Sequence, residues 1–238
     1  MKAMWIIGIA VSCIAIALWF FGPRLVKTVW LIARISPFER TIKDAPSILI
    51  LGDSTGYGTG ATRGSESIAG LIAADFPTYS IANNSENGRT IGELVPVSET
   101  VTQQYELILL QIGGNDILQK RDPAVVESEL RTIVSNLAER TTHLVMMSSG
   151  NVGGASAFSG KKGQEYEAIT RTYRALFMEV ALDTPLTYID LFLEPENDPF
   201  VTNPKKYLSA DGLHPSSAGY AQWYQSLQPV LTNKLTSE

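Results

Sequence analysis

The sequence has little cysteine and little histidine: one cysteine and two histidines occur in 238 residues. The cysteine is Cys13, so the chain can form no internal disulfide and no cysteine-ligated metal site. With so few thiolate and imidazole ligands, a transition-metal centre is also disfavoured. We therefore expect a protein that requires neither a metal ion nor an organic cofactor.

Charge is absent from one long stretch. No charged side chain occurs from Ala3 to Pro23, a run of 21 residues. As a helix this run would be about 31 Å long, which matches the hydrocarbon thickness of a bilayer. We therefore predict that residues 1–24 form a single transmembrane anchor. The alternative is a cleaved signal peptide, but its apolar region should be shorter, and no small-residue cleavage site follows Phe21.

The net charge changes sign after Lys43. Residues 1–43 carry six basic side chains and one acidic one, whereas the remainder carries 13 basic and 23 acidic ones. Nucleic acid would require a basic face on the folded domain, so we expect no nucleic-acid partner. The basic N-terminal part suits a membrane surface instead. The charges that flank the predicted anchor weakly favour a cytoplasmic domain, but the very short N-terminal tail also fits an exported one, so the side of the membrane stays open.

Residues 25–45 are predicted to form an amphipathic juxtamembrane segment and linker. Leu25–Ile35 has apolar side chains along one helical face and basic side chains away from it, which is typical of a helix lying on a bilayer surface. A simple continuation of the anchor helix is the alternative.

From residue 46 to residue 238 the pattern is that of one alternating α/β domain. The helices are marked by a capping box at Thr90 and Glu93 and by Asp122-Pro123, an N-cap followed by a proline at the first helical position. Short apolar runs between them fit strands that are buried on both faces of a parallel sheet. These runs are Ser47–Leu51, Tyr79–Ala82, Leu107–Ile112, His143–Met147 and Leu186–Ile189. We predict a three-layer α/β/α sandwich with its site at the carboxyl ends of the strands.

The first strand leads into a sharp turn, Gly52-Asp53-Ser54-Thr55-Gly56. Such a turn exposes the hydroxyl of Ser54 beyond the end of the sheet and points backbone N–H groups toward it. A phosphate-binding loop would also be rich in glycine, but the spacing matches neither known phosphate motif. The turn also fits the G-x-S-x-G elbow of α/β-hydrolases, although that elbow normally follows several strands. A purely structural turn is equally compatible with the glycine content.

A carboxylate lies three residues before one of the two histidines, in Asp211-Gly212-Leu213-His214. At this spacing Asp211 can accept a hydrogen bond from Nδ1 of His214, which leaves Nε2 to take a proton from a serine. His143 lies in an apolar strand run, and we interpret it as structural.

Two further blocks follow predicted strands. In Gln111–Asp116, two glycines allow a close backbone approach, and the amide of Asn115 can stabilise negative charge on an oxygen atom. In Asn83–Thr90, Gly88 can present its N–H at a helix start. Each block can equally be a plain turn when it is taken alone. The pocket walls are expected to come from the loops 152–163 and 194–207.

Taken in order, four blocks resemble the SGNH (GDSL-type) hydrolases. They are Gly52-Asp53-Ser54, Gly88, Gly113-Gly114-Asn115-Asp116 and Asp211-Gly212-Leu213-His214, and the resemblance spans Ile48 to Leu231. It implies a flavodoxin-like fold with Ser54 as the nucleophile, His214 as the base and Asp211 orienting that base. It also implies an oxyanion hole formed by the backbone N–H groups of Ser54 and Gly88 and by the side chain of Asn115.

The sequence departs from the family pattern at two positions. Ser85 stands where the second block usually has its first glycine, and Thr55 stands where a leucine commonly follows the serine. These departures affect the loop geometry before Gly88 and leave the substrate unassigned.

The expected function is hydrolysis of small-molecule or lipid esters, including lysophospholipid-like ones, by a serine esterase on a single-pass membrane anchor. An O-acyltransferase or deacetylase acting on a glycan or a lipid is the first alternative, because the same acyl-enzyme can react with an alcohol. A membrane-tethered binding domain that has lost activity is the second. Nothing in the sequence predicts an oligomeric state.

Overall fold

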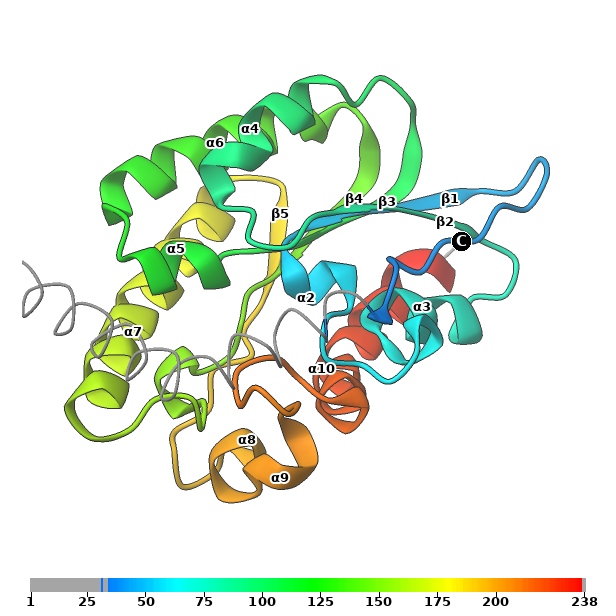
Figure 1. Cartoon of the computed structure of the whole chain (residues 1–238). Helices are drawn as coiled ribbons and strands as arrows, with labels where there is room; N and C mark the ends of the chain where they lie inside the picture. The colour runs from blue at the N-terminus through cyan, green and yellow to red at the C-terminus, as the bar shows by residue number, and fades with distance from the viewer. Residues whose placement is uncertain (1–30, 32–33, 237–238) are drawn as a thin grey trace, which may run out of the picture.

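The computed structural model describes Leu31 and residues 34–236, which contain a parallel sheet of five strands (Figure 1). The strand order is β2-β1-β3-β4-β5, and every neighbouring pair is parallel. The strands are β1 (Ser47–Gly52), β2 (Ser80–Ser85), β3 (Tyr105–Gln111), β4 (Thr141–Met147) and β5 (Leu186–Ile189). All five predicted strands are therefore confirmed. The end points of β5 match the prediction, and those of the other four strands differ from it by at most three residues.

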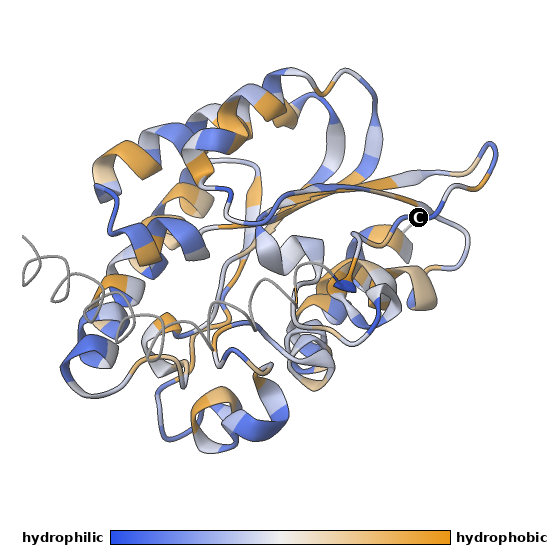
Figure 2. Cartoon of the chain, viewed as in Figure 1, coloured by the Kyte–Doolittle hydropathy of each residue, from blue (hydrophilic) through white to orange (hydrophobic). Residues whose placement is uncertain are grey.

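Helices cover both faces of the sheet, and each face carries its own apolar core (Figures 1 and 2). On one face, α3 (Ile68–Asp75) and α10 (Ser217–Thr236) pack over Ile48, Ile50 and Leu109. On the other, α4 (Ile91–Glu99), α6 (Pro123–Ala138) and α7 (Gly160–Asp183) pack over Leu49, Leu51 and Leu110. Successive strand residues point to opposite faces, so continuously apolar strands supply both cores. The predicted three-layer arrangement is confirmed.

The helix starts follow the local signals in the sequence. Thr90 and Glu93 form a reciprocal capping box at α4, and Asp122 caps α6 with Pro123 at its first position. The apolar stripe of α6 is fully buried; it consists of Val126, Leu130, Ile133, Val134 and Leu137. Capping and packing therefore agree in these two elements.

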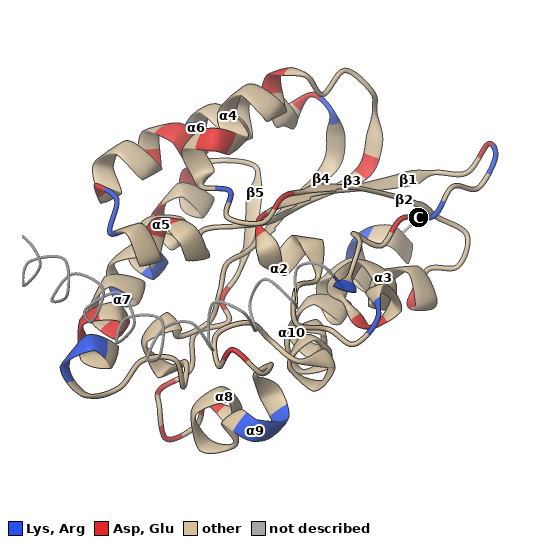
Figure 3. Cartoon of the chain, viewed as in Figure 1, with Lys and Arg blue, Asp and Glu red and all other residues tan. Residues whose placement is uncertain are grey.

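Charged side chains occur mainly on helices and loops, and several lie on α6 and α7 (Figure 3). Arg131 on α6 pairs with Glu127 and Asp183, and Arg171 on α7 pairs with Glu167 and Glu194. Exposed pairs of this kind contribute about 0–1 kcal/mol each. The two buried apolar layers, rather than these pairs, therefore account for most of the stability.

The strand order places a crevice where the chain reverses its direction across the sheet. From β1 the chain passes through α3 to β2 on one side, and then through α4 to β3 on the other side of β1. The order 2-1-3-4-5 is the flavodoxin-like order, in which ligands bind beyond the carboxyl ends of β1 and β3. Ser54 lies two residues after the end of β1, and Asn115 lies four residues after the end of β3, so both lie at this crevice.

The predicted membrane anchor, residues 1–24, lies outside the described residues. Within the part of the chain that the structure describes, no helix combines the length and apolar character needed to cross a bilayer. The domain limits proposed from the sequence stay a prediction.

Part of the predicted segment 25–45 is packed against the domain. Ile35 belongs to the core on the α3/α10 face, and Arg40 forms an antiparallel bridge with Ile81 at the outer edge of β2. The guanidinium of Arg40 donates hydrogen bonds of 2.6–3.1 Å to three backbone carbonyls at the end of α3 and beyond it, those of Ala73, Phe76 and Tyr79. Arg40 thereby satisfies carbonyl groups that a helix end leaves unpaired.

Candidate active site

The turn after β1 places Ser54 at the first position of α2 (Ser54–Tyr57), a helix of a single turn. Asp53 caps this helix and accepts hydrogen bonds from the backbone N of Thr55 at 2.8 Å and from its hydroxyl at 2.7 Å. Gly52 is required by close approach, since a Cβ there would lie 2.3 Å from the carbonyl oxygen of Gln111 on β3. Thr55 departs from the family pattern. Through its two hydrogen bonds to Asp53, it helps to hold the turn that exposes Ser54.

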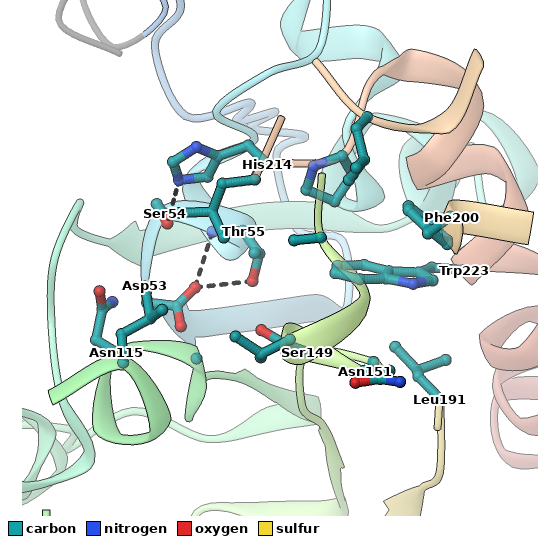
Figure 4. A pocket seen from close by; sticks show the side chains of 18 of the residues that line it. Asp53, Ser54, Thr55, Asn115, Ser149, Asn151, Leu191, Phe200, His214 and Trp223 are labelled. Carbon is teal, nitrogen blue, oxygen red and sulfur yellow. Dashed lines mark hydrogen bonds between the residues drawn. The ribbon is translucent and has the colours of Figure 1, made fainter. Parts of the chain in front are cut away.

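The structure brings the three predicted triad residues together in a line (Figure 4). Nε2 of His214 lies 2.9 Å from Oγ of Ser54, and Nδ1 of His214 lies 2.6 Å from Oδ2 of Asp211. With Asp211 ionised, Nδ1 is the donor in the second contact, so Nε2 remains an acceptor for the serine proton. Residues 160 positions apart in the sequence therefore have the geometry of a nucleophile and its base.

Asp211 is held in its ionised form by several donors. Its Oδ1 atom accepts hydrogen bonds from the hydroxyl of Ser209 and from the backbone N–H groups of Leu213 and His214. Burial alone would raise the pKa of Asp211, but the hydrogen bond and positive charge of His214 and these further donors bring that pKa well below its usual range. A carboxylate in this state orients the imidazole and stabilises the imidazolium that forms when a proton is taken up.

The loop that carries His214 is fixed at both ends. Leu208 and Pro215 form an antiparallel bridge, and the backbone N of Ser209 donates to the carbonyl of His214 at 2.8 Å. Gly60 adopts a φ of +98°, and a Cβ there would lie 2.2 Å from the carbonyl oxygen of Pro215 and 3.1 Å from Cβ of His214. Glycine at position 60 therefore allows the β1–α3 connection to pack directly behind the base.

The two other predicted oxyanion residues, Gly88 and Asn115, line the same cavity. Gly88 has a φ of +86° with open space around its Cβ position, so glycine is required there by backbone conformation and not by crowding. Asn115 lies in α5 (Gly114–Gln119), and its Nδ2 atom donates to the carbonyl oxygen of Arg89 at 3.0 Å. One amide hydrogen of Asn115 thus fixes the turn that contains Gly88, and the other remains for a ligand.

Two buried charged residues support this turn, and the sequence patterns assign no role to either. Arg89 donates to the carbonyl of Asn84 at 2.6 Å and pairs with Glu86 at 2.7 Å. Asp116 is fully buried and accepts hydrogen bonds from the backbone N of Ile91 at 3.0 Å and 3.2 Å. Arg89 follows Gly88 and Asp116 follows Asn115, so both lie in blocks from which the sequence predicts the site. This position is the signal in the sequence that could have indicated a role for them.

Asp116 connects the start of α4 to a second ion pair. Arg121 donates to Asp116 at 2.7 Å and to both carboxylate oxygens of Glu129 on α6. The start of α4, which follows Gly88, is therefore held to α5 by buried hydrogen bonds and to α6 by partly buried ones.

Ser85, the second departure from the family pattern, is buried beneath α2. A Cβ at Gly56 would lie 2.5 Å from its hydroxyl oxygen, so the hydroxyl occupies space that the glycine in α2 leaves open. The loop before Gly88 accommodates the serine by this contact.

One cavity of about 250 Å³ extends from Ser54 and His214 into the space between the β4, β5 and α8 (Pro199–Thr202) loops (Figure 4). Its surface beyond the triad is mainly apolar. The apolar lining residues are Leu118, Val152, Ala155, Leu191, Phe200, Leu208, Leu213, Pro215 and Trp223. Both predicted wall loops contribute to the cavity, whereas Leu191 and Trp223 come from segments that the sequence does not indicate.

Asp53 is a buried acid at the rim of this cavity. Burial raises its pKa to about 6, and the two hydrogen bonds from Thr55 and the charge of His214 act in the opposite direction. The neutral form of Asp53 is therefore favoured up to a higher pH than that of an ordinary aspartate.

His143 lies in the third position of β4, whereas the site lies beyond the other end of that strand. It is half-buried and does not line the cavity, in agreement with a structural interpretation. Among the described residues no group of three or more His, Cys, Asp or Glu side chains is arranged to hold a metal ion.

The same fold occurs in known lipolytic proteins. A G-D-S-L family protein from Veillonella parvula has a TM-score of 0.64 and 19% identity, over 79% of this chain and 99% of that one. The psychrotrophic esterase EstA from Pseudoalteromonas sp. has a TM-score of 0.59 and 19% identity, over 80% and 99%. An extracellular lipase from Streptomyces rimosus has a TM-score of 0.58 and 18% identity, over 78% and 99%. No curated protein sequence matches the chain.

The family is settled by the sequence together with this fold and site. Residues 50–222 match the model of the GDSL-like lipase/acylhydrolase family. The chain therefore belongs to this family, and it is a serine ester hydrolase of the SGNH type.

Proposed function

We propose that the protein cleaves carboxylic esters through an acyl-enzyme on Ser54. The observation that carries this proposal is the hydrogen-bonded line from Ser54 through His214 to Asp211, with contacts of 2.9 Å and 2.6 Å. A serine hydroxyl is a weak nucleophile unless a base removes its proton as it attacks. His214 is the only one of the two histidines that lines the cavity, so it is the base in this proposal.

The reaction proceeds in two halves. Oγ of Ser54 attacks the acyl carbon while Nε2 of His214 takes the hydroxyl proton, and the imidazolium then gives this proton to the departing alcohol oxygen. In the second half, His214 takes a proton from water, the hydroxide attacks the acyl carbon, and the acid is released as Ser54 regains its proton. Asp211 orients His214 and stabilises its charged form in both halves.

Negative charge develops on the former carbonyl oxygen in each half-reaction. We assign its stabilisation to the backbone N–H groups of Ser54 and Gly88 and to Nδ2 of Asn115, because these donors surround the Ser54 end of the cavity. The hydrogen bond from Asn115 to the carbonyl of Arg89 supports this assignment, since it holds Gly88 and Asn115 together before substrate binds.

The proposed substrate is a small-molecule or lipid ester with an apolar part that the cavity can bury. Its volume and mainly apolar wall support this class. The predicted anchor would place the site near a bilayer, where lipid esters occur; this part of the proposal rests on the uncharged run from Ala3 to Pro23 alone.

Labelling with a fluorophosphonate probe tests the proposed nucleophile. We expect the wild type to be labelled and to hydrolyse p-nitrophenyl esters, whereas Ser54→Ala should do neither. The matched control is Ser226→Ala, which changes an exposed serine on α10 and should behave like the wild type. Labelling that persists in Ser54→Ala would contradict the proposal.

Product analysis distinguishes hydrolysis from acyl transfer. Release of free acid that is unaffected by added alcohols indicates a hydrolase. Formation of a new ester with a glycan or lipid alcohol, at the expense of free acid, would instead indicate the O-acyltransferase considered from the sequence.

A further inference from the structure

The cavity has one open end and one closed end. Beside Ser54 its lining includes Gly88, which is exposed to solvent. Figure 4 shows Leu191, Phe200 and Trp223 across the cavity from Ser54, and these three lining residues are only 8–9% exposed. A ligand therefore enters at the Ser54 end, and any part of it that extends away from Ser54 runs toward a buried wall.

Three segments of the chain meet at the closed end. A Cβ at Gly150, in the loop after β4, would lie 3.1 Å from the carbonyl oxygen of Leu191 and 3.8 Å from Nε1 of Trp223. Leu191 lies in the loop after β5, and Trp223 lies on α10. Two strand loops and the last helix thus approach one point closely, in agreement with the low exposure of this end.

The indole of Trp223 is held by other rings. Its centroid lies 5.5 Å from that of Phe200 and 6.2 Å from that of Tyr220, which it meets edge-on. Tyr220 is fully buried, and its hydroxyl donates to the carbonyl of Thr59 at 2.7 Å. Close-packed rings of this kind leave little room for a side chain to move aside. Trp223 therefore forms a firm end wall.

A cavity that is mainly apolar, open beside the nucleophile and closed at the other end suits an unbranched aliphatic chain. Each methylene group that leaves water for such a site raises the affinity about fourfold, until the chain meets the end wall. A dry cavity of about 150 Å³ accommodates benzene, so this one of about 250 Å³ has room for roughly ten non-hydrogen atoms. The ester group itself takes part of this space, which leaves about six to eight carbon atoms for the chain.

We infer that Trp223 sets the longest aliphatic chain that the enzyme accepts, at about six to eight carbon atoms. This inference rests on the proposed function, because it specifies the substrate class of that same site. The chain belongs either to the acyl part or to the alcohol part of the ester, and both present the same methylene groups to the wall. In this role Trp223 contacts the end of the chain and takes no part in the chemical steps.

Two series of esters measure the accepted chain length. Straight-chain p-nitrophenyl esters from acetate to dodecanoate vary the acyl part, and straight-chain alkyl acetates from ethyl to dodecyl vary the alcohol part. In one series we expect kcat/KM of the wild type to rise up to about six to eight carbon atoms and then to fall by about tenfold or more. That series identifies which part of the ester reaches Trp223.

Two substitutions should shift the optimum in opposite directions. Trp223→Ala removes the indole, and because the surroundings collapse only in part, the optimum should move to chains longer by about two to four carbon atoms. Gly150→Ala adds a methyl group at the closed end, so the optimum should move to chains shorter by about one carbon atom. Both variants should hydrolyse the shortest ester within about twofold of the wild-type rate, since a short chain does not reach this wall.

Trp223→Phe keeps a ring in the same place and disturbs the packing less. It should move the optimum in the same direction as Trp223→Ala by about one to two carbon atoms, so the test does not depend on the folding of the alanine variant. The matched control is Tyr224→Ala, which removes the neighbouring ring on α10. Tyr224 does not line the cavity, so its variant should keep the wild-type optimum.

The outcomes separate this inference from the proposed function. Rates that do not fall toward dodecyl chains in either series would overturn the role of Trp223 and leave the proposed function standing. An optimum that Trp223→Ala and Trp223→Phe leave unchanged, or that Gly150→Ala does not shorten, would also overturn that role. A wild type that neither hydrolyses esters nor reacts with a fluorophosphonate would overturn the proposed function and this inference together.

Discussion

The two ends of the cavity are built in different ways. At the Ser54 end, the polar groups that act on the substrate are already held by the protein: Asp211 has four donors, and Asn115 is bonded to the carbonyl of Arg89. At the opposite end, the lining is mainly apolar and includes the rings of Phe200 and Trp223, which lie 5.5 Å apart. Preorganised polar groups accelerate a reaction, whereas an apolar wall contributes to the binding of the substrate. Changes at the first end should therefore lower kcat, and changes at the second should alter selectivity.

The largest effect is expected at the triad. His214→Ala removes the base that lies 2.9 Å from Oγ of Ser54, so kcat should fall by about 10⁴–10⁶ and leave a small residual rate from the oxyanion donors. Steady-state kinetics on a p-nitrophenyl ester measures this loss. The matched control is His143→Ala, which changes the other histidine; a comparable loss in that variant would contradict the assignment of the base.

The next effect is expected in the oxyanion hole. Asn115→Ala removes an amide donor and the bond that holds the Gly88 turn, so kcat should fall by about 10²–10³ with a smaller change in KM. Measurement of kcat and KM separately tests this. An Asn115→Ala protein with full kcat would remove Asn115 from the site, and a loss confined to KM would place it at the selective end of the cavity.

Asp53 should affect stability through pH. Its pKa is raised to about 6 in the folded protein, so the folded state binds more protons than the unfolded state between about pH 4 and pH 6. This contribution to the free energy of unfolding is therefore present at low pH, decreases as the pH rises through 6, and is absent at pH 8.

The neutral variant Asp53→Asn avoids burying that charge. It should be more stable than the wild type at pH 8, by up to about 3 kcal/mol, with the difference shrinking toward pH 4. Denaturant unfolding of both proteins at pH 4, 6 and 8 measures the difference. Equal stability at pH 8 would show that the ionised carboxylate is well accommodated beside Thr55.

The smallest effect on catalysis is expected at Arg40. A variant of this residue tests whether the loss of several hydrogen bonds away from the cavity affects kcat. Arg40 is bonded to three carbonyls but is remote from the cavity. Arg40→Met should lower the free energy of unfolding by about 2 kcal/mol and leave kcat unchanged. Thermal unfolding and ester hydrolysis measure the two quantities. Arg63→Met, which removes an exposed pair with Glu66, is the control and should change stability by less than about 0.5 kcal/mol.

The fold and the chemical end of the site could be predicted because they depend on local signals. Buried strands appear as short apolar runs, and Asp122-Pro123 marks a helix start wherever it occurs. Ser54 and Asn115 lie within four residues of the ends of β1 and β3, so the strand order places them at one crevice.

The selective end could not be predicted in the same way. Leu191 and Trp223 line the cavity because the loop after β5 and the helix α10 pass beside it, and no spacing in the sequence encodes that placement. The sequence pattern assigns Arg40 to a linker. The hydrogen-bond partners of Arg40 are backbone carbonyl groups, which every residue carries, so no motif in the sequence marks them. Tertiary contacts to the backbone leave no pattern in side-chain identity.

The bridge between Arg40 and Ile81 also bears on self-association. Outer strands expose unpaired N–H and C=O groups, and another chain can add to them and begin aggregation. At the β2 side of the sheet, the backbone of Arg40 already occupies these groups of Ile81 in both directions, at 3.0 Å and 2.7 Å. Truncation beyond residue 40 would uncover this edge, so a shortened enzyme intended for expression or crystallisation should begin before Ile35 in order to remain monodisperse at high concentration.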